Sequence, residues 1–157
     1  MKIRVLFTGR TTESWVRQGI EQYAGRIRHY VAFELVEIPD LKQTASLSEE
    51  QVKTREGELI LKAVRPTDHL VLLDERGERF SSVDWARNLE QKAAHLPKDC
   101  VFVVGGPYGF SPAVQARSNE RLSLSRMTFS HQLVRVVFLE QLYRALTIIK
   151  GEPYHHE

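Results

Sequence analysis

Short, mostly apolar runs alternate along this chain with segments whose apolar residues recur every three or four positions. Mostly apolar runs occupy residues 3–7, 69–73 and 100–104, and such runs are typical of strands covered on both faces. Residues 33–38 alternate between apolar and acidic side chains, which favours a strand nearer the edge of a sheet. This order predicts one α/β domain, residues 1–157, with a mostly parallel sheet covered by helices on both faces.

Helix signals fill the segments between the runs. Residues suited to capping precede the helical segments: Thr11 and Thr12, Ser48 with Gln51, Ser81 or Ser82, and Ser111 before Pro112. The last helix is expected from about His131 to Ile149, with Gly151 as its stop. The run at residues 69–73 is expected to stop at Asp74 and Glu75, and a short strand is expected at residues 122–124.

A glycine-rich turn, GGPYG, follows the apolar run at residues 100–104. Gly105, Gly106 and Gly109 leave the backbone open to a ligand, and open α/β sheets bind ligands beyond the carboxyl ends of their strands. The turn matches neither the P-loop nor the dinucleotide fingerprint. A second irregular segment, residues 123–130, follows the next strand. Two loops at one sheet edge predict a pocket for a small, partly apolar ligand, and a purely structural turn is the alternative.

Composition narrows the class of protein. The chain has 157 residues, a formal net charge of +2 and a single cysteine, so it cannot form an intrachain disulfide or a cysteine-rich zinc site. It has no apolar run long enough for a membrane span, and its first residues are not those of a signal peptide. We therefore expect a cytoplasmic protein that does not bind membranes. Basic residues exceed acidic ones over residues 1–30, which suits phosphate contact or a solvated face.

The tail, GEPYHHE, gathers side chains that can exchange protons. Adjacent histidines point apart and no neighbouring ligand set completes a shell, so no metal site is expected. Tyr154, His155, His156 and the carboxylate of Glu157 are instead suited to proton transfer or to holding a base.

The chain resembles the RlmH-like family of ribosomal RNA large-subunit methyltransferases, in the SPOUT superfamily. The resemblance covers the whole chain and rests on six segments in order: MKIRVLFTG, FELVEIPD, LLDERGERFSS, GGPYG, LSLSRMTFSHQLVRVVFLEQLYRA and GEPYHHE. It implies an α/β fold with a C-terminal deep trefoil knot that forms the S-adenosylmethionine pocket. It also implies a homodimer that methylates N3 of a pseudouridine in helix 69 of 23S ribosomal RNA, on the assembled ribosome, without a metal.

The resemblance also implies a role for individual residues. The expected cofactor contacts are Leu73, Gly105, Gly106, Leu124, Ser125, Arg126, Met127, Thr128 and Phe129. The tail is expected near the methyl-transfer site, with His155 as the candidate base and Tyr154 and His156 as supporting groups. The chain departs from the family at Ser130, where proline is common, and at His156, where arginine or lysine occurs.

Three alternatives stay open. The first alternative is a related SPOUT enzyme that acts on another RNA base. The second is a non-catalytic ribosome-binding or assembly factor that has the fold but does not carry out the reaction. The third alternative is an unrelated nucleotide-binding α/β protein that binds ATP or NAD in place of S-adenosylmethionine.

Overall fold

The computed structural model describes residues 1–96 and 98–156, and in them helices and strands alternate from end to end. The strands are β1 (Lys2–Thr8), β2 (Ala32–Ile38), β3 (His69–Arg79), β4 (Cys100–Val104) and β5 (Glu120–Ser123). The helices are α1 (Ser14–Ile27), α2 (Glu49–Ala63), α3 (Ser82–His95), α4 (Pro112–Arg117) and α5 (Leu133–Lys150). The prediction of an α/β fold is confirmed.

The strands form one sheet in the order β2-β1-β4-β3-β5, and every pairing in it is parallel. In the middle of the sheet, Ile3 of β1 and His69 of β3 both pair with Cys100 of β4. All five residues of β4 are buried, as its uninterrupted apolar run predicts. β2 lies at an edge, which confirms the expectation from its alternating pattern.

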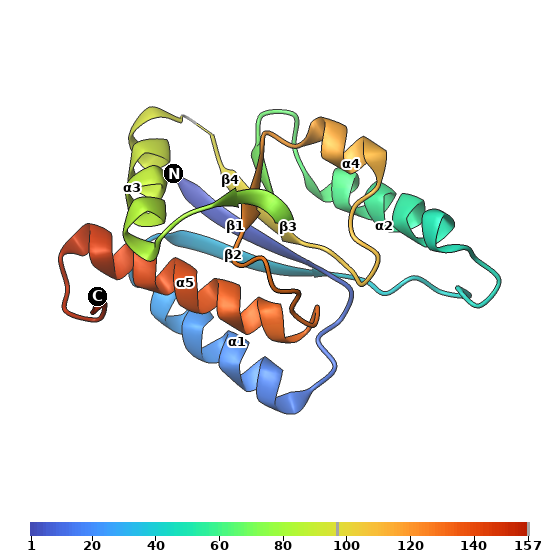
Figure 1. The fold of residues 1–157 in the computed structure, drawn as a ribbon, viewed down its shortest axis with the longest axis horizontal. Helices are drawn as coiled ribbons and strands as arrows, with labels where there is room; N and C mark the ends of the chain where they lie inside the picture. Colours follow the sequence, from blue (N-terminus) through green and yellow to red (C-terminus); the bar gives the residue numbers. More distant parts are fainter. Residues whose placement is uncertain (97, 157) are drawn as a thin grey trace.

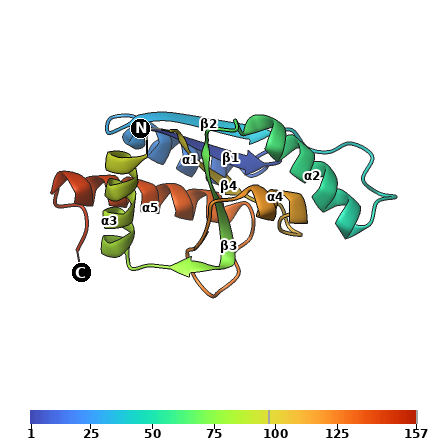
Figure 2. The same cartoon turned by 90° about the horizontal axis from the view of Figure 1, so that it is seen from above.

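Helices cover both faces of the sheet. α1, α3 and α5 pack on one face around Phe102 and Phe138, whereas α2 and α4 pack on the other around Leu72 and Val103. α1 and α5 run side by side (Figure 1). Seen from above, α2 and α4 lie at one end of the molecule, and α3 lies with the C-terminus at the other (Figure 2). In the described part of the chain, no helix has the length and apolar character needed to cross a membrane.

Most of the predicted caps are present. Ser48 and Gln51 form a reciprocal capping box, and Ser81 and Ser111 accept N–H bonds at the starts of α3 and α4. The prediction for α1 is wrong, because its N-cap residue is Glu13 and no side chain caps it. Thr11 and Thr12 bind elsewhere: their backbone N–H groups donate to the side chains of Glu37 and Gln132.

β3 continues past the predicted stop at Asp74. After a register shift, Glu78 and Arg79 pair with Leu122 and Ser123, so β3 runs along β5 on both sides of its irregular stretch. Gly77 allows this close approach, because a Cβ atom there would lie 2.6 Å from the backbone carbon of Arg121. The deep knot implied by the resemblance stays a prediction.

Candidate functional site

The glycine-rich turn after β4 forms the first wall of the site. The N–H of Gly109 donates to the carbonyl oxygen of Gly106 at 3.2 Å, and Gly109 has a φ of 81°, which favours glycine. This compact turn places Pro107 and Tyr108 at its tip, with Tyr108 exposed. The turn then leads into α4, whose first turn is capped by Ser111.

The segment between β5 and α5 forms the second wall. Its own serines organise it: the N–H of Met127 donates to Oγ of Ser125 at 3.0 Å, and Ser123 Oγ donates to the carbonyl oxygen of Ser125 at 2.9 Å. Ser130 Oγ accepts the N–H of Leu133 at 3.0 Å. The serine at position 130 therefore helps to start α5, and a proline side chain could not accept this N–H.

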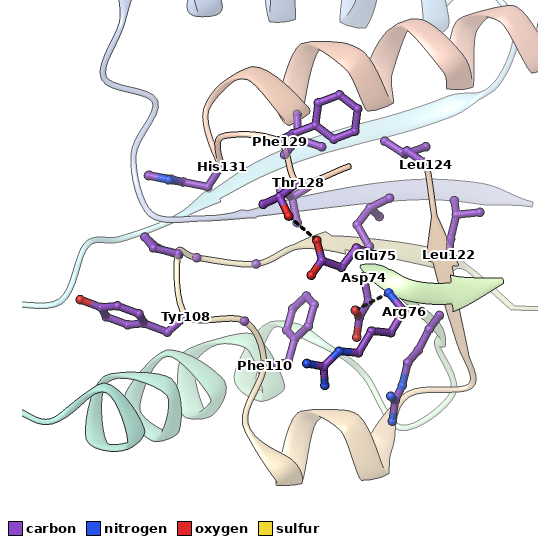
Figure 3. A pocket seen from close by; sticks show the side chains of 18 of the residues that line it. Asp74, Glu75, Arg76, Tyr108, Phe110, Leu122, Leu124, Thr128, Phe129 and His131 are labelled. Carbon is purple, nitrogen blue, oxygen red and sulfur yellow. Dashed lines mark hydrogen bonds between the residues drawn. The ribbon is translucent and has the colours of Figure 1, made fainter. Parts of the chain in front are cut away.

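The irregular stretch of β3 forms the third wall. Asp74 Oδ1 accepts the N–H of Arg76 at 2.9 Å, which closes a tight turn. Glu75 Oε2 accepts the hydroxyl of Thr128 at 2.6 Å, and this bond joins β3 to the second wall (Figure 3). All three walls therefore meet at the carboxyl ends of the strands.

The three walls enclose a cavity of about 630 Å³, which is well within the size range of small-molecule sites. Of the nine expected cofactor contacts, all except Arg126 line this cavity: Leu73, Gly105, Gly106, Leu124, Ser125, Met127, Thr128 and Phe129. Arg126 lies in the same loop, exposed to solvent. The chain thus brings together positions that are far apart in sequence.

Several further residues line the cavity without having been expected there. Lys53, Arg76 and Arg121 bring positive charge to the cavity, which the carboxylates of Asp74 and Glu75 also line. The signal for the two arginines was weak, because arginine in a polar turn is usually a solvated residue.

Phe110 and His131 complete the walls of this cavity. Phe110 is 7% exposed, and its ring would lie 3.0 Å from a Cβ atom added at Gly105. Burial lowers the pKa of His131 from its usual value, and the nearby guanidinium of Arg135 lowers it further. A neutral imidazole is therefore favoured at this position. The sequence placed His131 only at the expected start of the last helix.

Arg135 fixes the start of α5 beneath the site. Its side chain is fully buried and donates to the carbonyl oxygens of Thr8, Gly9 and His131 at 2.9, 3.0 and 3.1 Å. Its guanidinium also lies 4.9 Å from the centre of the Phe7 ring. Burial lowers its pKa, and the carboxylate of Glu37 partly offsets this effect. Arg135 thereby joins β1 to the loop that bounds the cavity.

The tail lies elsewhere in the same chain. Tyr154 packs on Tyr143 with ring centres 4.7 Å apart and donates its hydroxyl to Glu140 at 3.1 Å. The guanidinium of Arg144 lies 3.1 Å from Nδ1 of His155. Neither these residues nor His156 line the cavity, and the C-terminus lies at the opposite end of α5 from the loop that precedes this helix (Figure 1). Glu157 lies outside the described residues.

An all-parallel sheet with a glycine-turn cavity at its carboxyl edge is a ligand-binding α/β arrangement. A family model described as predicted SPOUT methyltransferase matches residues 1–155. The chain therefore belongs to the SPOUT methyltransferase family, and S-adenosylmethionine is the methyl donor of this family.

Curated relatives carry a more specific name. The chain is 53% identical over its full length to the ribosomal RNA large subunit methyltransferase H of Parabacteroides distasonis, and the match also covers that whole protein. Proteins of the same name from Bacteroides fragilis and Porphyromonas gingivalis are 49% and 52% identical, again over both full lengths.

One solved structure adds support for the fold alone. A probable methylase family protein from Haemophilus influenzae superposes with a TM-score of 0.53 at 12% identity. The match covers 95% of this chain and 66% of that one.

The residues that line the cavity are suited to binding S-adenosylmethionine. Gly105 and Gly106 remove side chains where a ligand must approach the backbone, and Leu73 and Leu124 offer apolar contacts. Asp74 and Glu75 supply carboxylates for a cationic ligand. Within the described residues, no group of three or more histidine, cysteine, aspartate or glutamate side chains is placed to hold a metal ion.

Proposed function

We propose that this methyltransferase modifies N3 of a pseudouridine in helix 69 of 23S ribosomal RNA, on the assembled ribosome in the cytoplasm. The observation that carries the proposal is the cavity, which gathers eight of the nine positions expected to bind the cofactor. Relatives that match along their full length are named ribosomal RNA large subunit methyltransferase H, which supports the same substrate class.

The bound cofactor would supply a methyl group bonded to a sulfonium sulfur; when the N–C bond forms, the S–C bond breaks and the neutral thioether leaves. Leu73, Leu124 and Phe129 would hold the apolar part of the cofactor, while Gly105 and Gly106 would let backbone groups reach it. Arg126, exposed beside the cavity, is proposed to complete the contacts once the cofactor is bound. Positioning is the main catalytic effect expected, since well-oriented reactants reach effective molarities of about 10⁵–10⁸ M.

The acceptor nitrogen must lose its proton before it attacks the methyl group in line. His155 is our candidate proton acceptor, with Tyr154 and His156 as supporting groups. A general base of this kind contributes about 10²–10⁴-fold to a rate. In the folded chain, the guanidinium of Arg144 contacts Nδ1 of His155 and so helps to orient the imidazole.

Two copies are needed for the tail to act at a cavity. Within one chain, Tyr154 and His155 contact α5 residues that do not line the cavity. We therefore propose a homodimer in which the tail of one copy reaches the cavity of the other. Pairing also doubles the basic surface of residues 1–30, which favours binding to ribosomal RNA in its assembled form.

Mass mapping of helix 69 tests the function. Cells that lack this protein should lose one methyl group on the pseudouridine, and the intact gene should restore it. A Gly105→Val gene should not restore it. A methylated helix 69 in the deletion strain would overturn the proposal, and restoration by Gly105→Val would indicate a non-catalytic assembly factor. Purified enzyme should prefer ribosomes to an isolated hairpin, and its activity should fall steeply with salt.

Mixed dimers test the shared site. Gly105→Val removes a cavity and His155→Ala removes a tail, so each homodimer should be inactive. If the tail acts across the dimer, refolding the two variants together should restore about one quarter of the activity, since half of the dimers are mixed and each holds one intact site. If each tail serves its own cavity, mixing restores nothing.

A further inference from the structure

A second cavity lies directly beside the first. It encloses about 330 Å³, at the lower end of the range for small-ligand sites, roughly 300–1,000 Å³. Pro107, Tyr108 and His131 line both cavities and so form the boundary between them. The side chains of Tyr108 and His131 extend to the same side, away from Arg76 (Figure 3). A ligand in the second cavity would therefore adjoin a cofactor in the first.

Two residues that line this second cavity each carry a buried side-chain oxygen without a hydrogen-bond partner. Across residues 1–96 and 98–156, unpartnered buried side-chain atoms are few, and both Thr8 Oγ1 and Glu56 Oε1 are among them. Thr8 is only 5% exposed, at the end of β1. Because an unpaired buried polar group costs free energy, two such groups in one cavity indicate a polar ligand that pairs with them.

Gly106 provides the space for the Glu56 carboxyl. A Cβ atom at position 106 would lie 2.7 Å from Oε2 of Glu56, so only glycine leaves the carboxyl in this place. Burial raises the pKa of Glu56 above its usual value, because desolvation is not compensated by a donor. A ligand N–H would supply that donor. The glycine-rich turn that lines the first cavity thus also determines where the Glu56 carboxyl lies beside the second.

The chemistry of the proposed acceptor decides which edge of the base these groups meet. If N3 is to receive the methyl group, it must face the boundary with the first cavity. Thr8 and Glu56 line only the second cavity, beyond that boundary, so they would meet the edge of the ring next to N3 and not N3 itself. There pseudouridine has an N1–H next to a carbonyl, whereas uridine has a C–H at the position of N1.

We propose that the second cavity holds the acceptor base and that Glu56 selects pseudouridine by accepting its N1–H. Thr8 Oγ donates to the adjacent carbonyl oxygen, and the ring of Tyr108 is available for stacking on the base. No proton leaves N1 in this contact, so the removal of the N3 proton is a separate event. The inference rests on the proposed function, because it needs a pseudouridine acceptor.

The test compares two substrates that differ only in this edge. Ribosomes from cells that do not make the pseudouridine carry uridine at the same position. The wild-type enzyme should methylate pseudouridine ribosomes at least about 10²-fold faster in single turnover, since a site built to bond an N–H discriminates strongly against an analogue without it. Glu56→Leu should reduce this ratio to within about 3-fold, mainly by slowing the reaction on pseudouridine. Glu56→Gln, whose amide oxygen still accepts, should keep part of the ratio.

Cofactor binding separates this inference from the proposed function. Both Glu56 variants and Thr8→Val should bind S-adenosylmethionine as the wild type does in calorimetry, and the exposed residue Glu58 on the same helix provides a matched control, Glu58→Gln. An unchanged substrate ratio in Glu56→Leu, or loss of cofactor binding in the Glu56 variants, would overturn the inference. A wild-type enzyme that modifies neither ribosome would instead overturn the proposed function.

Discussion

The two ends of α5 are each organised by an arginine, in opposite ways. At the start of the helix, Arg135 is fully buried and donates to backbone oxygens of β1 and of its own loop. Toward the other end, Arg144 keeps 23% of its side chain exposed and pairs with Glu140 and His155. One arginine lies inside the core, and the other lies on the surface that receives the tail.

The different burial of the two arginines indicates that the start of α5 is fixed, whereas the tail at the other end can move. The buried hydrogen bonds of Arg135 cannot exchange partners unless the core opens. The end of α5 beside the cavity is therefore fixed once the sheet has formed. The tail is held on the surface of α5 by ring packing on Tyr143 and by hydrogen bonds to partly exposed side chains, and a second chain can replace these contacts. We infer that cofactor binding belongs to the single chain and that the contribution of the tail depends on the dimer.

The largest effect is expected from disabling the cavity end. Gly105→Val places branched carbons where even a Cβ atom would lie 3.0 Å from the Phe110 ring, and it narrows the wall that the cofactor needs. Calorimetry should show at least a 100-fold loss of S-adenosylmethionine affinity, about 2.7 kcal/mol or more. Gly25→Ala is the matched control, because a Cβ atom there meets nothing within 4 Å. Unimpaired binding in Gly105→Val would place the cofactor elsewhere.

A smaller effect should distinguish the two arginines. Arg135→Met leaves the carbonyl oxygens of Thr8 and Gly9 without their buried donor, at a cost of about 2–4 kcal/mol in the free energy of unfolding. Arg144→Met should cost about 1 kcal/mol or less, since its contacts are partly exposed. Urea denaturation of both variants measures this. Equal losses would show that the two ends of α5 do not differ in the way described.

The smallest effect concerns the tail at alkaline pH. Burial, followed by the charge of Glu140, raises the pKa of Tyr154 from 10.0 to about 12. Because the folded pKa is the higher one, the docked tail is fully stabilised below pH 10 and loses that stability as pH rises toward about 12. Glu140→Gln should lower this pKa in a tyrosinate absorbance titration. Tyr30, raised to about 12 mainly by its hydrogen bond to Glu152, is the internal reference and should not move.

The sequence predicted the local features of this molecule well. β4 is a continuous apolar run and is buried throughout, and the Ser48–Gln51 pair forms the expected capping box. Both features depend on neighbours in sequence. The cavity was also predictable, because parallel strands bring their carboxyl ends to one edge and the glycine turn marks one of them.

What depended on contacts distant in sequence was harder to predict. Thr11 and Thr12 are residue types that commonly cap helices, but here their backbone N–H groups donate to the side chains of Glu37 and Gln132. β3 extends through a charged stretch because β5 pairs with it there, and no pattern in residues 74–79 signals that pairing. The second cavity was equally hidden, since Thr8 and Glu56 meet only through the packing of β1, α2 and the glycine turn.

The parallel sheet has a consequence for how the protein is made. Among the described residues no two strands are joined by a hairpin, and β1 gains its second neighbour, β4, only after residues 100–104 have been synthesised. Until then one edge of β1 has no partner and is open to pairing with strands of other chains. At a synthesis rate of about 5–20 residues per second, this lasts several seconds or more. Chaperone dependence and loss to inclusion bodies should therefore increase sharply in variants truncated before residue 100.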